Sequence, residues 1–194
     1  MMSRYKRIVA AIVLALAQIG FLGWMIAGRA ALLRSGQEVL LKVEPVDPRD
    51  LLRGDYVRLG YDISRLPVER VANLPQGETT SAEGPIVVRL KKDADGFWRA
   101  TSAWLGSAAL TPAAADEVDI RGEISDGWSL APGSEIGVEY GIERFYVPEG
   151  EGLAIERDMR VRSFGIRVAV GKDGSGQIKA LMDGDTMLFE EPLY

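Results

Sequence analysis

The 194-residue chain contains neither cysteine nor histidine. Without these residues it cannot form a Ser-His-Asp triad, a Cys-His pair or the usual zinc sites. The lack of cysteine also excludes disulfides and a lipid-modified cysteine. Three Asp- and Gly-containing stretches, residues 93–96, 173–175 and 183–185, lack the ligand spacing of a twelve-residue calcium loop, and turn chemistry explains them. We therefore expect no metal site and no cofactor.

Long hydrophobic runs are also scarce, because the chain has only one, residues 8–28, with Gln18 as its polar interruption. A helix of this length spans ~30 Å, the hydrocarbon thickness of a bilayer. Three basic side chains precede the run and two follow it closely, so the positive-inside rule places the N-terminus in the cytoplasm. A cleaved signal peptide is the alternative, since residues 15–17 resemble a cleavage site. The length of the run favours an uncleaved anchor.

The position of this run divides the chain. We predict a cytoplasmic N-terminus (1–7), a transmembrane anchor (8–28), a juxtamembrane linker (29–37) and an extracytoplasmic domain (38–194). Five of the 23 basic residues and none of the 28 acidic ones precede residue 36, which leaves 18 basic against 28 acidic residues and a formal charge of −10. Such a domain is a poor partner for nucleic acid and for anionic lipid surfaces.

The part of the chain after the anchor alternates apolar and polar residues with a period of two, which is typical of strands with one wet face. Short strands separated by Gly, Pro and Asp predict one all-β domain, a sandwich or a partly closed barrel. The expected strands are 39–44, 56–63, 86–91, 97–103, 118–124, 134–140, 142–147, 153–156, 161–170 and 177–182. Short helical turns are expected only at 47–52 and 112–117.

The segment 44–64 is the least ordinary part of this domain. Gly54 and Asp55 are turn residues that precede the expected strand 56–63. One face of that strand is apolar and predicted to join the core: Val57, Leu59, Tyr61 and Ile63. The other face is polar and predicted to be solvated or ligand-facing: Tyr56, Arg58, Gly60 and Asp62.

Gly54-Asp55-Tyr56, Leu59 and Tyr61 spell G-D-Y-x-x-L-x-Y, and the chain resembles the bacterial family named for this pattern, the GDYXXLXY proteins. The stretch 45–53 and the block 140–149 resemble two further marked segments of that family. With the N-terminal helix, the resemblance covers nearly the whole chain. It implies membrane-anchored proteins that are often encoded beside, or fused to, multi-span membrane proteins. It implies no catalytic residue.

Structural roles are the default expectation for the motif residues: a turn for Gly54 and Asp55, and half-buried phenols with bonded hydroxyls for Tyr56 and Tyr61. Charged groups of the two blocks are better candidates for recognition. The candidate binding residues are Arg53, Asp55, Tyr56, Arg58, Tyr61, Arg144 and Glu149.

These patterns favour a binding or accessory protein over an enzyme. We expect a single-pass protein of the bacterial cytoplasmic membrane, with a periplasmic domain that serves a multi-span membrane protein by tethering. One alternative is a module that binds an envelope glycan or peptide through the face of Tyr56, Arg58 and Asp62. Another is a signal-peptidase-like Ser-Lys hydrolase that uses Ser35 with Lys91 or Lys92.

Overall fold

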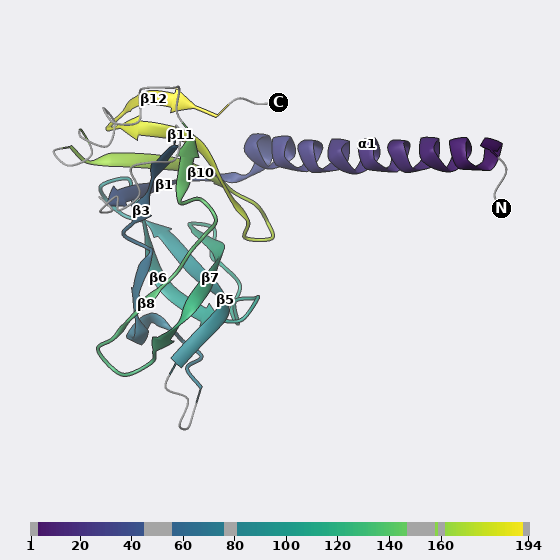
Figure 1. Cartoon of the computed structure of the whole chain (residues 1–194). Coiled ribbons are helices and arrows are strands. Elements are labelled where there is room, and N and C mark those ends of the chain that lie inside the picture. The colour runs from purple at the N-terminus through teal and green to yellow at the C-terminus, as the bar shows by residue number, and fades with distance from the viewer. Residues whose placement is uncertain (1–3, 45–55, 76–80, 147–157, 159–161, 192–194) are drawn as a thin grey trace.

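A computed structural model describes residues 4–44, 56–75, 81–146, 158 and 162–191, with the backbone alone at 56–58 and 126. The chain forms one long helix followed by antiparallel strands (Figure 1). The predicted fold class, mainly β with a single N-terminal helix, is confirmed, and the strands build an open, sandwich-like arrangement of sheets.

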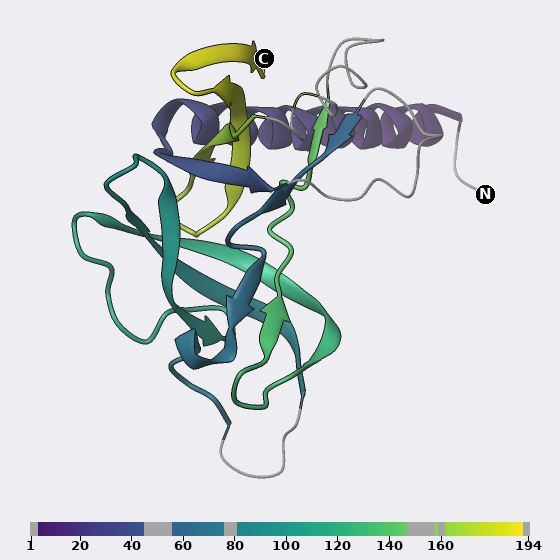
Figure 2. The same cartoon turned by 90° about the vertical axis from the view of Figure 1, so that its left-hand side faces the viewer.

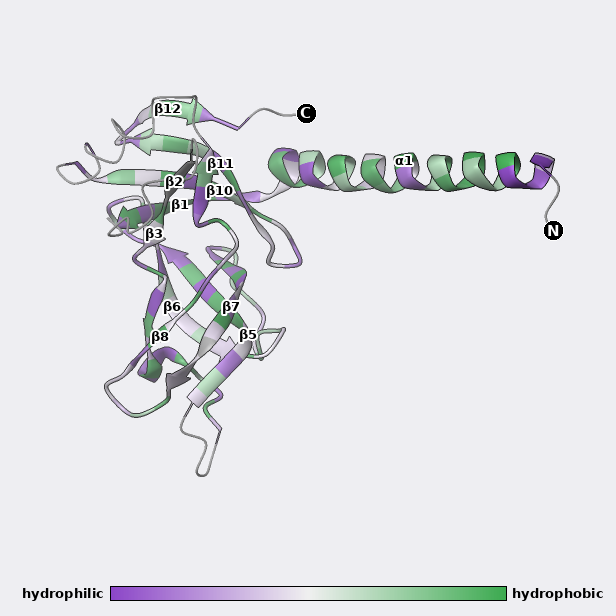
Figure 3. Cartoon of the chain, in the orientation of Figure 1, coloured by the Kyte–Doolittle hydropathy of each residue, from purple (hydrophilic) through white to green (hydrophobic). Residues whose placement is uncertain are grey.

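The helix, α1 (Arg4–Ser35), contains the whole apolar run. In the part of the chain that the structure describes, it is the one helix that is long and apolar enough to cross a membrane, as an anchor or as a signal sequence. The run projects away from the strands without burying its side chains, and Figure 3 colours most of the helix as hydrophobic.

The junction between α1 and the strands is short and packed. α1 continues to Ser35, and β1 (Gln37–Glu44) begins two residues later, so the predicted linker 29–37 consists of the last turns of the helix, residue 36 and the first residue of β1. Ala30 and Leu33 are buried. A Cβ at Gly36 would lie 2.8 Å from the Leu32 carbonyl oxygen, so this tight exit from the helix favours glycine.

The sheet nearest α1, which we call the proximal sheet, has the strand order β12-β11-β10-β1-β3. Its other strands are β3 (Gly60–Tyr61), β10 (Phe164–Val170), β11 (Gly176–Asp183) and β12 (Thr186–Glu190). The end of α1 contacts β10 and β11. β10 is central, because strands pair with both its edges, and it is almost wholly buried, since it also contacts α1 and β7.

A second sheet, which we call the distal sheet, has the order β6-β5-β7 and lies away from α1 (Figures 1 and 2). Its strands are β5 (Ser81–Lys92), β6 (Trp98–Leu105) and β7 (Glu117–Ser129). The predicted hairpin between β5 and β6 is confirmed, with Gly96 at φ +89° in its turn. Apolar side chains of both sheets meet in one core.

Two short strand pairs complete the fold: β2 (Tyr56–Arg58) with β9 (Arg144–Tyr146), and β4 (Arg65–Pro67) with β8 (Glu135–Gly137). A 3-10 turn, η1 (Val68–Arg70), follows β4.

Several local predictions need correction. The expected strand 56–63 is interrupted at Leu59, whose N–H donates to the Glu143 carbonyl. The helical turn expected at 112–117 is wrong, because residues 112–114 have no regular structure and β7 begins at Glu117. β4 and β12 were not expected. The predictions at 47–52 and 153–156 lie outside the described residues.

Candidate functional site

Two buried tyrosines join the segment 44–64, which contains the motif, to the block 140–149, which we call the second sequence block. The Tyr61 hydroxyl donates to the Ile142 carbonyl at 2.5 Å, and the Tyr140 hydroxyl donates to the Ile63 carbonyl at 2.7 Å. We call this reciprocal pair the tyrosine clasp. Burial raises the pKa of both phenols well above their usual range, and the nearby Glu143 carboxylate raises it further. Both hydroxyls therefore stay protonated and remain donors.

Backbone bonds extend the tyrosine clasp in both directions. Leu59 donates to the Glu143 carbonyl at 2.9 Å, and Val138 donates to the Ser64 carbonyl at 2.9 Å. The Tyr140 N–H donates to the Glu143 carboxylate at 2.5 Å. The motif residues Leu59 and Tyr61, and Ile63 beyond them, are each only 1% exposed, so these side chains act in the core and present almost no surface to a ligand.

The structure does not describe every one of the other predicted binding residues. Arg53, Asp55 and Glu149 lie outside the described residues, as do the side chains of Tyr56 and Arg58. The backbone register places Tyr56 opposite Tyr146, and Arg58 opposite Arg144, so β2 and β9 bring the two blocks together.

Asp62, from the predicted polar face, is turned toward another part of the chain. Its carboxylate lies 3.3 Å from the Arg99 guanidinium, and its side chain is 15% exposed. Burial raises the pKa of Asp62, and Arg99 only partly opposes that shift. Asp62 is therefore packed against β6 and does not stand on an open ligand-facing surface.

Ser35 and Lys91, two of the residues considered for a Ser-Lys dyad, do not have the required environment. The Ser35 hydroxyl donates to the Ala31 carbonyl at 2.8 Å. Lys91 is about half exposed and lies 2.9 Å from Asp116, and this hydrogen bond raises the pKa of its ammonium group. A lysine base needs a lowered pKa. Within the described ranges, no group of three or more acidic side chains is arranged to hold a metal ion.

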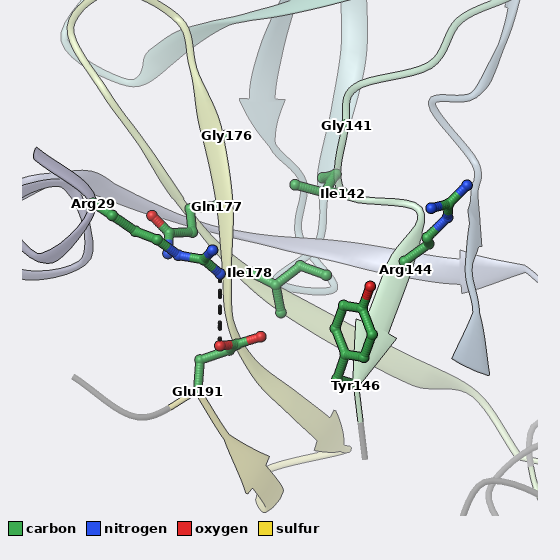
Figure 4. A pocket seen from close by; sticks show the side chains of 9 residues that line it. All are labelled: Arg29, Gly141, Ile142, Arg144, Tyr146, Gly176, Gln177, Ile178 and Glu191. Carbon is green, nitrogen blue, oxygen red and sulfur yellow. Dashed lines mark ion pairs between the residues drawn. The ribbon is translucent and has the colours of Figure 1, made fainter. Parts of the chain in front are cut away.

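A cleft of about 400 Å³ lies at the junction of α1 with the strands (Figure 4). We call it the junction cleft. It brings together the end of α1, β9, β11, the residue that follows β12, and part of the second sequence block. Its lining residues are Arg29, Gly141, Ile142, Arg144, Tyr146, Gly176, Gln177, Ile178 and Glu191.

The polar groups of the junction cleft differ in how completely they are paired or hydrogen-bonded. The Arg29 guanidinium lies 3.8 Å from the Glu191 carboxylate (Figure 4), a long ion pair in which the Arg29 side chain is 55% exposed and the Glu191 side chain 14%. Gln177 is 9% exposed, and its Nε2 is buried without a hydrogen-bond partner among the residues that the structure describes. This amide is a donor in need of an acceptor.

Arg144 is the one predicted binding residue whose described side chain lines this cleft. Sequence reasoning missed Arg29, Gln177 and Glu191, which come from three distant segments. The position of Arg29, directly after the apolar run, was a usable signal. Nothing local distinguishes Gln177 or Glu191 from other polar residues of strands and strand ends.

Comparison with known proteins identifies one family. The model of the family described as GDYXXLXY protein matches residues 18–181, which include the second half of α1, the tyrosine clasp and most of the junction cleft. No curated protein and no solved structure matches the chain. Because the family match covers most of the sequence, this chain belongs to the GDYXXLXY protein family.

Proposed function

We propose that this protein is a membrane-anchored accessory protein that holds a β domain in a fixed position beside a multi-span membrane protein. The observation that carries the proposal is the docked end of α1. The helix runs without interruption from its apolar segment into the domain, where Ala30 and Leu33 are buried against the strands. A domain held in this way has less orientational freedom to lose when it binds a partner in the same membrane.

The apolar segment supports the membrane part of the proposal. Its large side chains, such as Leu14, Ile19 and Trp24, are exposed and make no core with the strands. They suit lipid or the helices of another membrane protein. The excess of basic residues before the segment favours a cytoplasmic N-terminus and a domain outside the cytoplasmic membrane.

The chemistry of the domain supports a binding role. Histidine and cysteine are absent from the sequence, and Lys91 is held in its charged form by Asp116. The formal charge of −10 after residue 35 favours protein partners over nucleic acid. Tethering requires no reactive group, because confinement to the membrane raises the effective concentration of the partner.

The membrane part is tested by topology and by mass. A periplasmic reporter fused after Tyr194 is expected to be active, and a cytoplasmic reporter at the same site inactive. The purified protein is expected to have the mass of the uncleaved chain and to resist extraction from membranes by carbonate. Cleavage after the apolar run, or release by carbonate, would show that α1 is a signal sequence.

The accessory role is tested by purification of the tagged full chain, at native expression, from detergent extracts. Six Gly/Ser residues inserted between Gly28 and Arg29 uncouple the domain from the membrane span but leave the docked turns of α1 intact. A matched control has the same insertion after Ser107, in an exposed loop of the distal sheet. We expect the wild type and the control to retain a multi-span protein, and the junction insertion to lose it about fivefold or more. Equal recovery in all three proteins, or no multi-span partner with the wild type, would reject this role.

A further inference from the structure

β12 is the outermost strand of the proximal sheet, and one of its two edges is unpaired in the described part of the chain. β11 pairs with the other edge, and the bond from the Glu191 N–H to the Lys179 carbonyl, at 2.8 Å, lies on that same side. Figures 1 and 2 show β12 at the upper border of the molecule, away from the distal sheet. A free edge presents N–H and C=O groups that can pair with another strand.

The distal sheet differs, because other parts of the chain bond to both its edges. At the outer edge of β6, the Ala72 N–H donates to the Ala103 carbonyl at 2.9 Å. At the outer edge of β7, the Arg121 N–H donates to the Gly174 carbonyl at 2.8 Å. The edge of β12 thus stands out among the sheet edges as one that another molecule can complete.

The middle of β12 is apolar and exposed. Met187 is 48% exposed and Leu188 is 38% exposed. A bulge leaves Leu188 outside the register with β11 and increases the local twist, so the segment that fits this edge is short. Edges that are protected against pairing carry charges or proline along the strand. The exposed apolar pair does the opposite, because an incoming strand would remove it from water.

Acidic side chains mark both ends of the strand. Asp185 directly precedes β12 and Glu190 is its last residue. Both are exposed, and neither has an ion pair among the residues that the structure describes. A second β12, paired in either direction, would bring like charges together at both ends, which opposes self-association. A strand with a basic residue at each end, about 17 Å apart, matches this arrangement.

The end of β12 lies next to the end of α1. Glu191, the residue after the strand, lies 3.8 Å from Arg29, the first residue after the apolar run 8–28 (Figure 4). With α1 in the bilayer, as the proposed function requires, this end of β12 is close to the membrane surface. A segment that has just left the same membrane can therefore reach the free edge.

We propose that the free edge of β12 binds a short extended segment of the multi-span partner, which adds a strand to the proximal sheet. The partner's identity as a multi-span protein rests on the proposed function. Apolar side chains in the middle of the segment cover Met187 and Leu188, and Lys or Arg at its two ends faces Asp185 and Glu190. Main-chain hydrogen bonds hold the segment, and its side chains decide which segment binds.

The test uses the full chain in neutral detergent micelles and three capped heptapeptides. The first alternates Val and Thr between two terminal Lys residues, the second has Glu at both ends, and the third has Lys ends and a central Pro. Binding is measured by calorimetry and by NMR shifts of the backbone amides. We expect the first peptide to bind saturably and to shift residues 186–190. The Glu-ended and Pro-containing peptides should bind about fivefold more weakly or less.

Variants then assign the binding to β12. Leu188→Lys places a charge in the middle of the edge and is expected to weaken binding of the Lys-ended peptide about tenfold. Reversal of both end charges, Asp185→Lys with Glu190→Lys, should exchange the preference, so that the Glu-ended peptide binds about fivefold more tightly than the Lys-ended one. Glu135→Lys, at an exposed acid on β8, is the matched control and should bind like the wild type. Because the altered side chains are exposed, the melting temperatures should stay close to that of the wild type.

Four outcomes would overturn the strand addition: no saturable shifts at 186–190, equal binding of the Lys- and Glu-ended peptides, no exchange of preference in the doubly reversed variant, or a loss in Glu135→Lys equal to that in Leu188→Lys. A dimer of the full chain in micelles that Leu188→Lys dissociates would identify a second copy as the occupant. Peptide binding does not depend on topology or partner recovery. A retained multi-span protein without peptide binding would reject the edge alone, and peptide binding without such a protein would reject the accessory role.

Discussion

Arg89 in the distal sheet and Gln177 in the proximal sheet are the two buried polar side chains among the described residues, and their surroundings differ. Arg89 donates to both carboxylate oxygens of Asp119, at 2.7 and 2.8 Å, and to the hydroxyl and carbonyl oxygens of Thr111. Its guanidinium carbon also lies 4.7 Å from the Trp104 ring centroid. Gln177 leaves its Nε2 without a partner within the described ranges.

The difference lies in how completely the buried donors of each residue are hydrogen-bonded. A buried group with all its hydrogen bonds made stiffens the fold and needs nothing further. The Arg89 network also fixes the loop around Thr111 against β5 and β7. The Gln177 amide, which lies near the junction with α1, has the opposite property, since its buried Nε2 has no acceptor among the described residues and lowers stability. The two sheets therefore differ in how completely these two buried side chains are bonded.

The largest expected effect is on Arg89. Arg89→Met keeps much of the side-chain volume but removes every donor, which leaves Asp119 beside an apolar group. We expect the free energy of unfolding to fall by about 3 kcal/mol, measured by denaturant titration of the full chain in micelles with tryptophan fluorescence. Arg99→Met, at an exposed arginine, serves as the control and should cost clearly less. Equal losses would break the contrast between buried and exposed networks.

The tyrosine clasp is a second buried network with its bonds made. Tyr61→Phe and Tyr140→Phe each remove one hydroxyl and leave the carbonyl of Ile142 or Ile63 without that donor. We expect each variant to lower the free energy of unfolding by about 1–2 kcal/mol, measured in the same titration. Tyr146→Phe, at a largely exposed phenol, is the matched control and should be close to neutral. A neutral result for both clasp variants would mean that the family motif does not act through these bonds.

Gln177→Met tests the other side of the comparison. It removes the unsatisfied donor but keeps a similar shape, so we expect the free energy of unfolding to stay equal or to rise by up to about 1 kcal/mol. The sign should thus oppose that of Arg89→Met. A loss comparable with that of Arg89→Met would show that Gln177 is bonded in solution and would remove the contrast.

The smallest effect concerns pH and Asp62. Because burial raises the pKa of this carboxyl, the folded state holds its proton more tightly than the unfolded state. This contribution is fully present below the unfolded pKa of about 4 and is lost as the pH rises through the folded pKa. The neighbouring charges of Arg99, Lys42 and Glu44 set the size of the shift.

Asp62→Asn removes that titration. We expect a flatter decline of unfolding free energy in the variant than in the wild type from pH 4 upward, measured by denaturant titration across a pH series. Asp185→Asn, in the turn before β12, is a control at a site with no such burial. Identical pH profiles for the wild type and Asp62→Asn would contradict the burial of this charge.

Local patterns predicted much of the fold. The apolar run of α1, the Asp-Gly turn between β5 and β6, and the inward face of Leu59, Tyr61 and Ile63 follow from residue type and spacing, because each depends on neighbours in the chain. The interruption at Leu59 and the short edge strand β12 were missed. The interruption depends on the carbonyl of Glu143, which lies far along the sequence. β12 exposes most of its side chains, so its sequence lacks a clear alternation of apolar and polar residues.

The family, the single membrane-length helix and the mainly β class were readable from residues alone, since motifs, hydrophobic length and two-residue alternation are local properties of a chain. The tertiary structure decided the rest. It turned the expected linker into a docked helix end and made Tyr61 part of a clasp. It also joined Arg29, Arg144, Gln177 and Glu191 into one cleft. These residues lie up to 162 positions apart, and only strand pairing and core packing bring such distant groups together.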